Sequence, residues 1–117
     1  MSGEKIVYIV DRIVPKAGTA REFFAYYMSN YVPVAEGRGV TLLHRWVSPP
    51  VWLDGDQCNT LSFVWTVAGA AGYWAAEAKA RWDATSGDFW RSIEPMIESR
   101  VRSVMADAGD IESLINV

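Results

Sequence analysis

The sequence predicts a single α+β domain, spanning residues 1–117, in which strands and helices follow the order β-α-β-β-α-β. Three observations support this prediction. Four segments have the composition of strands, rich in Ile, Val and aromatic residues. Two long segments between them have the three- and four-residue spacing of amphipathic helices. The length is that of one domain, and no segment repeats another.

Residues 5–14, KIVYIVDRIV, form the first predicted strand, which ends at Pro15. A capping box from Thr19 to Glu22 then predicts the start of a helix, and Pro33 ends or kinks it. The strand has one face of Val7, Ile9, Asp11 and Ile13 and another of Tyr8, Val10, Arg12 and Val14. The apolar stripe of the helix consists of Phe23, Phe24, Tyr27, Met28 and Tyr31.

The second and third predicted strands are residues 40–48 and 59–68, joined by a loop at residues 49–57. Trp52 in this loop is expected to cover a site, to contact a partner, or to pack on the domain. In the second strand, alternation places Leu42, His44 and Trp46 on one face and Leu43, Arg45 and Val47 on the other. In the third strand, one face consists of Leu61, Phe63, Trp65 and Val67.

The spacing of apolar residues predicts the second long helix at residues 69–84. A second capping box at residues 85–88 predicts the start of a short helix. Residues 98–106 form the last predicted strand, and the tail is expected to add a helical turn. The buried stripe of the long helix is expected to contain Trp74, Ala78 and Trp82, and the short helix carries Phe89, Trp90 and Ile93.

Two β-α-β units in series predict a ferredoxin-like fold, with four antiparallel strands and both helices on one face of the sheet. The first three strands are largely apolar on both faces, so the face without helices is expected to be covered as well. The sequence therefore predicts a homodimer in which two bare faces meet as a barrel around an apolar pocket.

Composition excludes several classes of function. The net charge is −3, and the Lys and Arg residues form no basic stripe, which argues against nucleic-acid binding. The longest apolar run is too short for a membrane span. The N-terminus has no signal-peptide pattern, and the one cysteine, Cys58, excludes an internal disulfide. A cytoplasmic protein is expected.

The motifs of common catalytic centres are missing. One histidine, one cysteine and no HExxH or CxxC pattern make a zinc site improbable, so no metal is expected. The nucleotide-binding patterns GxGxxG and GxxxxGK[ST] are absent, as is the GxSxG pattern of serine hydrolases. We therefore expect no cofactor.

His44 and Asp11 are the acid/base candidates. His44 has the only side chain whose ordinary pKa lies near neutrality, and it is either an ordinary structural histidine or a pocket acid/base. Asp11 lies among apolar neighbours, so it is either paired with Arg12 of a partner chain, Arg100 or Arg102, or it is a base in the pocket that orients His44. The expected substrate-binding residues are Tyr8, Trp46, Trp65 and Trp74 on the pocket wall, with Arg12 or Arg45 holding an anionic group.

The run DRIVPKAGTAREF and the later strand and helix FVWTVAGAAGYWAA resemble the dimeric α/β-barrel superfamily. This group includes antibiotic-biosynthesis-type cofactor-free monooxygenases, stress-responsive barrel proteins, polyketide cyclases of the same fold and haem-degrading monooxygenases. The resemblance covers most of the chain. Its motifs specify the fold rather than the reaction.

The haem-degrading members supply one alternative function. Asp11 falls where those proteins carry an Asn that faces the ligand, and Trp74 falls where they carry a Trp that contacts the haem. Their axial His has no counterpart here, because residues 75–97 contain no histidine. Haem is therefore disfavoured.

The predicted function is binding and conversion of a small aromatic or polycyclic hydrophobic molecule in the barrel pocket, without metal or nucleotide. The resemblance implies monooxygenase-, cyclase- or isomerase-type chemistry, in which the protein deprotonates or orients a reactive substrate and excludes water. The alternative is a non-catalytic dimer that stores, carries or senses a ligand, or a purely structural partner.

Overall fold

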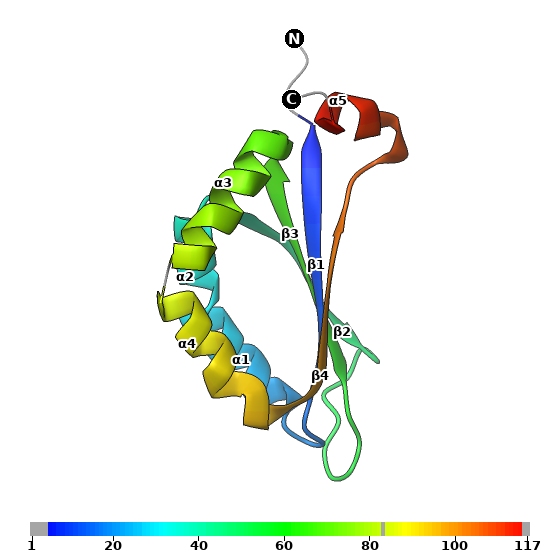
Figure 1. Cartoon of the computed structure of the whole chain (residues 1–117). Helices are drawn as coiled ribbons and strands as arrows, with labels where there is room; N and C mark the ends of the chain where they lie inside the picture. The colour runs from blue at the N-terminus through cyan, green and yellow to red at the C-terminus, as the bar shows by residue number, and fades with distance from the viewer. Residues whose placement is uncertain (1–4, 83, 116–117) are drawn as a thin grey trace.

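A four-stranded antiparallel sheet forms the centre of the molecule, with the strand order β2-β3-β1-β4. In this computed structural model, residues 5–82 and 84–115 are described. Helices α1 to α4 all lie on one face of the sheet (Figure 1). The strands are β1 (Ile6–Pro15), β2 (Thr41–Ser48), β3 (Thr60–Ala68) and β4 (Ile97–Met105). The predicted ferredoxin-like fold is confirmed.

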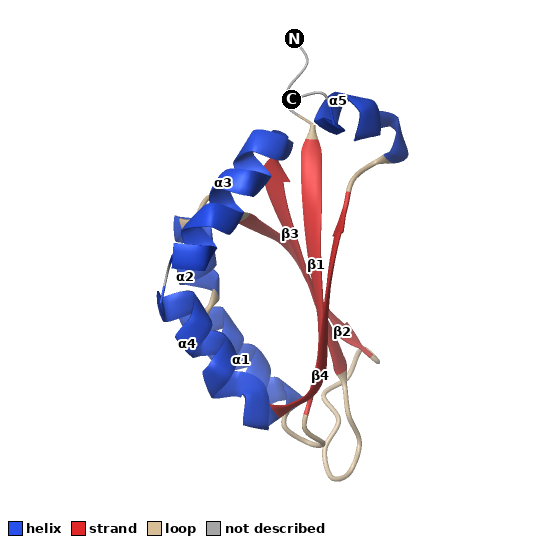
Figure 2. Cartoon of the chain, viewed as in Figure 1, coloured by secondary structure: helices blue, strands red, loops and turns tan. Residues whose placement is uncertain are grey.

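The helices leave the other face of the sheet bare (Figure 2). They are α1 (Ala20–Asn30), α2 (Val32–Gly37), α3 (Gly69–Trp82), α4 (Ala84–Ile93) and α5 (Ile111–Ile115). Two 3-10 turns, Glu94–Met96 and Ala108–Asp110, precede β4 and α5. None of the helices in the described ranges has the length and apolar character needed to cross a membrane.

The core lies between the helices and the face of the sheet that they cover, here called the helix-side face. Strand register builds this face, because it sets Ile9 beside Trp65 and Ile13 beside Leu61, all of them buried. The predicted stripe of α1 packs on it: Phe23, Tyr27 and Tyr31 are buried, and Phe24 and Met28 are partly buried. Period-two and period-3.6 spacing therefore predicted the core of this half correctly.

The buried stripe of α3 differs from the prediction. Trp74 is 63% exposed and Ala78 is exposed, whereas Ala76 is buried and faces the sheet. The side chain of Trp82 lies outside the described part. Helix α3 runs so close to the sheet that a Cβ atom on Gly72 would lie 3.2 Å from Val67 Cγ2. The side of α3 that faces the sheet carries Tyr73, Ala76 and Ala80, and the ring of Trp74 lies on the outer side.

Both predicted capping boxes differ in detail. Helix α1 begins after Thr19 as predicted, but the Thr19 hydroxyl donates to the carbonyl of Lys16 (2.7 Å) instead of accepting from Glu22. Helix α4 begins at Ala84, before the box predicted at residues 85–88. The side chains of residues 85 and 86 lie outside the described part.

A β-bulge in β2 changes the predicted faces of that strand. Leu42 pairs with Trp65, and His44 pairs with the next residue of β3, Val64. Leu43 is thus the extra residue, and two residues of β2 oppose one of β3. Leu42 consequently lies on the helix-side face, and the prediction that it shares a face with His44 is wrong.

The loop between β2 and β3 is anchored at its end by Asn59, which is 1% exposed. Its side-chain oxygen accepts from the backbone N–H of Leu53 (2.9 Å), and its amide nitrogen donates to the carbonyl of Val51 (2.8 Å). Trp52 packs on Phe24, with ring centroids 5.6 Å apart. Of the expected roles for Trp52, the structure shows packing on the domain.

Candidate functional site

The side chains predicted to form a site lie on both faces of the sheet and on one helix. On the bare face, here called the open face, are Tyr8, Arg12, His44 and Trp46. On the helix-side face are Asp11, Arg45 and Trp65. Trp74 lies on the outer side of α3.

The predicted acid/base pair is not brought together. Asp11 pairs with Phe63 and faces the helices, whereas His44 pairs with Val64 on the open face. Because the sheet separates the two side chains, Asp11 cannot orient the imidazole of His44.

The open face carries a wide depression of about 590 Å³. The rings of His44 and Trp46 stack there, with centroids 4.5 Å apart and planes at 16°. Trp46 is nevertheless 56% exposed. The depression is lined by Tyr8, Val10, Arg12, Leu43, His44, Trp46, Ser62, Val64, Met105, Ala106 and Asp107. Most of the lining residues in the middle of the sheet are apolar, and the lining also contains charged side chains.

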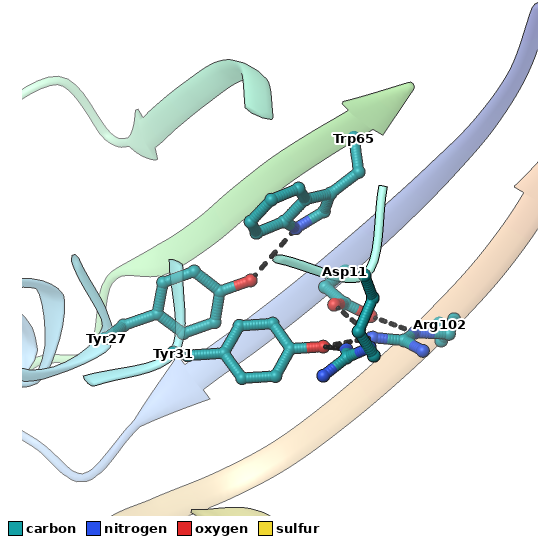
Figure 3. A network of polar contacts seen from close by, with 6 residues as sticks. Asp11, Tyr27, Tyr31, Trp65 and Arg102 are labelled. Carbon is teal, nitrogen blue, oxygen red and sulfur yellow. Dashed lines mark hydrogen bonds and ion pairs between the residues drawn. The ribbon is translucent and has the colours of Figure 1, made fainter. Parts of the chain in front are cut away.

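An ion pair between a buried carboxylate and a partly exposed arginine marks the helix-side face (Figure 3). Asp11 is completely buried, and its two carboxylate oxygens accept from Nε and Nη2 of Arg102, both at 2.8 Å. The two residues are direct neighbours across β1 and β4. Of the alternatives open for Asp11, the structure shows the pair with Arg102. Burial lowers the pKa of Arg102, but the hydrogen bonds and charge of Asp11 raise it more, so the guanidinium stays charged.

Tyr31 receives hydrogen bonds from two arginines. Nη2 of Arg38 donates to its hydroxyl at 2.9 Å, and Nη2 of Arg102 donates at 3.4 Å. A guanidinium can only donate, so the hydroxyl oxygen accepts both bonds. Its own proton can then be donated to a third group.

Tyr27 and Trp65 form a second polar contact beside the ion pair (Figure 3). Nε1 of Trp65 donates to the Tyr27 hydroxyl at 3.0 Å, and the Tyr27 ring stacks on Phe63 with centroids 3.8 Å apart. Burial raises the pKa of Tyr27 well above its usual value, and the negative charge of Asp11 raises it further. Tyr27 is therefore a neutral phenol that fixes the indole of Trp65.

A cavity between α3 and the helix-side face reaches this network. Its volume is about 30 Å³, room for about one water molecule. Tyr73 and Glu77 of α3, both half-buried, belong to its lining. Partial burial raises the pKa of Tyr73, and the charge and hydrogen bond of Glu77 raise it further. The lining consists of Ile9, Tyr31, Arg38, Val40, Trp65, Tyr73, Ala76, Glu77, Ala80 and Arg102.

Sequence reasoning missed most of this network. Tyr31 has the spacing of a core residue in a helix stripe, and Arg38 lies between the two glycines that follow the predicted helix. Arg102 was only one of several candidate partners for Asp11. The available signal was the isolated carboxylate in an apolar strand, which had to have a buried cation close by. The positions of Tyr31 and Arg38 depend on how α1 and α2 dock, which no local pattern encodes.

Comparison with known proteins shows similarity in structure but not in sequence. No protein-family model and no curated protein matches the sequence. Two solved NIPSNAP family proteins from Agrobacterium tumefaciens share the fold. One, described as of unknown function, has a TM-score of 0.68 and 13% identity over 90% of each chain. The other has a TM-score of 0.70 and 12% identity over 92% of this chain and 90% of that one.

A third similar structure comes from another organism. An uncharacterized NIPSNAP domain protein from Burkholderia xenovorans has a TM-score of 0.67 and 17% identity, covering 88% of this chain and 94% of that one. At such low identity the similarity shows the fold alone. Fold does not determine chemistry, so the function has to be argued from the site.

Proposed function

We propose that this protein is a homodimer that binds a small aromatic or otherwise hydrophobic molecule in the cleft between α3 and the helix-side face. One observation carries the proposal: the cavity is lined by aromatic rings, by Tyr31 and by Arg102, whose guanidinium is paired with the fully buried Asp11. A buried ion pair adds little net stability, so a fold gains little from one. Charged groups at the end of an apolar cavity are typical of ligand sites.

The dimensions of the cleft favour the smaller of the expected ligands. The cavity holds about one water molecule, so an aromatic ring enters only if Tyr73 and Glu77 move aside. Both are half-buried side chains on the surface of α3. The residues below them, Ala76 and Ala80, are small and leave room once the larger side chains turn. A ligand of one ring fits this arrangement better than a polycyclic one.

The open face supports pairing with a second copy of the chain. Leu43, Trp46 and Met105 are 46–56% exposed there, around the depression of about 590 Å³. Exposed apolar groups gathered on one sheet face favour association. A two-fold axis would bring the same face of each copy together, so the contact would be self-complementary.

The proposal is for binding, with no metal or nucleotide. The geometry gives no support to monooxygenase-, cyclase- or isomerase-type conversion by His44 together with Asp11, since the sheet lies between them. In a homodimer, His44 would lie at the pairing face and Asp11 would stay buried on the helix-side face. A non-catalytic ligand-binding dimer agrees best with this arrangement.

A pair of α3 variants tests the cleft as the binding site. Ala80→Phe places a ring in the cavity, whereas Ala78→Phe places the same ring on the exposed side of the helix. We expect phenol and benzamide to shift the NMR signal of the Trp65 indole N–H in the wild type and in Ala78→Phe. In Ala80→Phe we expect binding at least about tenfold weaker, since each 1.4 kcal/mol of lost contact costs about that factor.

The Trp65 indole signal can be assigned by its disappearance in Trp65→Phe. Equal binding by the Ala78 and Ala80 variants would place the ligand elsewhere. If no single-ring molecule of any charge shifts the signal, the proposed function is wrong.

A further inference from the structure

Three hydrogen-bond donors, Tyr31, Arg38 and Arg102, belong to the lining of the cavity. The Tyr31 hydroxyl accepts from Arg38 and from Arg102, so its own proton can be donated to a ligand. Asp11 takes Nε and one terminal nitrogen of Arg102. The second terminal nitrogen of Arg102 can therefore donate to a ligand, while Asp11 holds the plane of the guanidinium in place.

Positive charge lies inside the cleft and negative charge lies on α3. Among the described residues that line the cavity, the charged ones are Arg38, Arg102 and Glu77. Arg38 is 9% exposed, whereas Glu77 is half-buried on α3. Asp11 is not part of the lining, and both its oxygens are taken by Arg102. A molecule in the cavity thus meets the buried guanidinium of Arg38, the partly exposed guanidinium of Arg102 and one hydroxyl proton.

Burial gives Tyr31 and Arg38 more influence than they would have in water, and Arg102 is partly exposed. Electrostatic attraction and hydrogen bonds are stronger where the surroundings are apolar, and hydrogen bonds to ionised groups are the strongest. Guanidinium groups match the two oxygens of a carboxylate in geometry as well as in charge. A neutral amide of the same shape has an NH2 group in place of one carboxylate oxygen. The NH2 group is a donor, and the guanidinium groups cannot accept from it.

We infer that the cleft selects small aromatic molecules that carry an anionic oxygen group, above all aromatic carboxylates, with the anion held by Tyr31, Arg38 and Arg102. The inference rests on the proposed function, because it names the class of molecule that the cleft binds. The charge of Glu77 opposes such a ligand, so this charge weakens the binding of anions without affecting neutral molecules.

Benzoate and benzamide are the matched probes, since they differ by one carboxylate oxygen against one NH2 group. Titration of the full-length wild type, followed by the Trp65 indole N–H signal, is expected to show benzoate binding about tenfold tighter than benzamide or more. Raising the salt concentration is expected to weaken benzoate binding moderately, because Arg38 is buried and poorly screened whereas Arg102 is partly exposed.

Three variants locate the preference. Arg38→Met removes one cation while keeping an unbranched apolar stem, and it should bring the two affinities within about threefold of each other. Arg100→Met is the control, because Arg100 packs over the Trp90 ring (3.9 Å to its centroid) and is not part of the cavity lining. Glu77→Gln should tighten benzoate binding and leave benzamide binding unchanged.

The outcomes separate the two proposals. If benzoate and benzamide bind the wild type equally, the anion preference is wrong but the cleft remains the binding site. Failure of both probes would overturn the proposed function and the inference together. If Arg38→Met does not fold, the wild-type comparison and the Tyr31→Phe variant still test the anion preference. If the preference for benzoate over benzamide is unchanged in both Tyr31→Phe and Glu77→Gln, the assignment of these residues is wrong.

Discussion

At the scale of single residues, the buried polar groups decide how this protein differs from a plain sheet covered by helices. Asp11 lies among apolar residues in the middle of β1, and Arg102 on the neighbouring strand compensates its charge. Tyr31 and Arg38 then extend the hydrogen bonding towards the cavity. Each member satisfies the next, so removing one leaves a polar group without its partner in an apolar place.

Asp11→Asn is the substitution that tests this dependence. It keeps the shape of the side chain but leaves the charge of Arg102 uncompensated. We expect the free energy of unfolding to fall by about 2–4 kcal/mol. This loss is smaller than for a fully buried pair, because the Arg102 side chain is 33% exposed. Urea unfolding measures this change.

Asp88→Asn is the matched control for Asp11→Asn. Asp88 pairs with Arg91 on the surface of α4, where both side chains are largely exposed. A loss below about 1 kcal/mol is expected, as for other surface pairs. Similar losses in the two variants would show that burial of the Asp11–Arg102 pair has no special effect.

At the scale of elements, the turns fix how strands and helices meet. The turn between β1 and α1 contains Gly18, whose φ angle is +74°. The same glycine touches the loop between β2 and β3: its backbone N–H donates to the carbonyl of Gln57 (3.0 Å). A Cβ atom on Gly18 would lie 2.9 Å from the backbone oxygen of Gly55. Two loops at one end of the sheet therefore depend on a position that only glycine suits.

Two Gly→Ala substitutions are expected to have opposite effects. Gly18→Ala should lower the free energy of unfolding by more than about 1 kcal/mol, because of the positive φ and the contact with Gly55. Gly37→Ala should raise it by about 0.4–1 kcal/mol, because Gly37 has no atom within 4 Å of the added Cβ and sits in a helix. Thermal and urea unfolding of both variants give the signs, and an undiminished stability of Gly18→Ala would contradict the tight approach of these two loops.

At the scale of the whole molecule, the sheet is covered on one face and bare on the other (Figure 2). The bare face carries exposed apolar side chains, including Val101 on β4, which pairs with Arg12. Such a face is costly in water, so a second copy is the simplest cover for it. The shape of the single chain therefore predicts its assembly.

Val101→Glu tests the pairing of open faces, with Val51→Glu as its control. Val101 is 56% exposed on the open face, and Val51 is 58% exposed in the loop between β2 and β3. Light scattering after size exclusion should show a dimer at micromolar concentration for the wild type and for Val51→Glu. A buried carboxylate at the interface is expected to weaken the Val101→Glu dimer at least about tenfold.

Two results would contradict this pairing. A monomeric wild type at micromolar concentration would mean that the open face is not covered by a second copy. A dimer of equal strength in both variants would place the interface away from β4 and the open face.

The sequence by itself determined the order of the elements, the ferredoxin-like sheet and most of its buried face. Alternation in β1 and spacing in α1 are local properties, and local patterns are sufficient to read them. They failed where a tertiary constraint intervened. The bulge at Leu43 changed the faces of β2, and the docking of α3 turned Ala76 towards the sheet and Trp74 outwards.

Only the tertiary structure decided the candidate site. Asp11 and Arg102 are 91 residues apart in sequence, and Tyr31 and Arg102 are 71 apart. No local signal joins such positions, because strand register and helix docking set their distances. The sequence could show that Asp11 needed a partner, since a carboxylate in an apolar strand has to be compensated. Which cation compensates it followed from the register of β1 with β4, and the position of His44 across the sheet from it followed from the registers of β3 with β1 and β2.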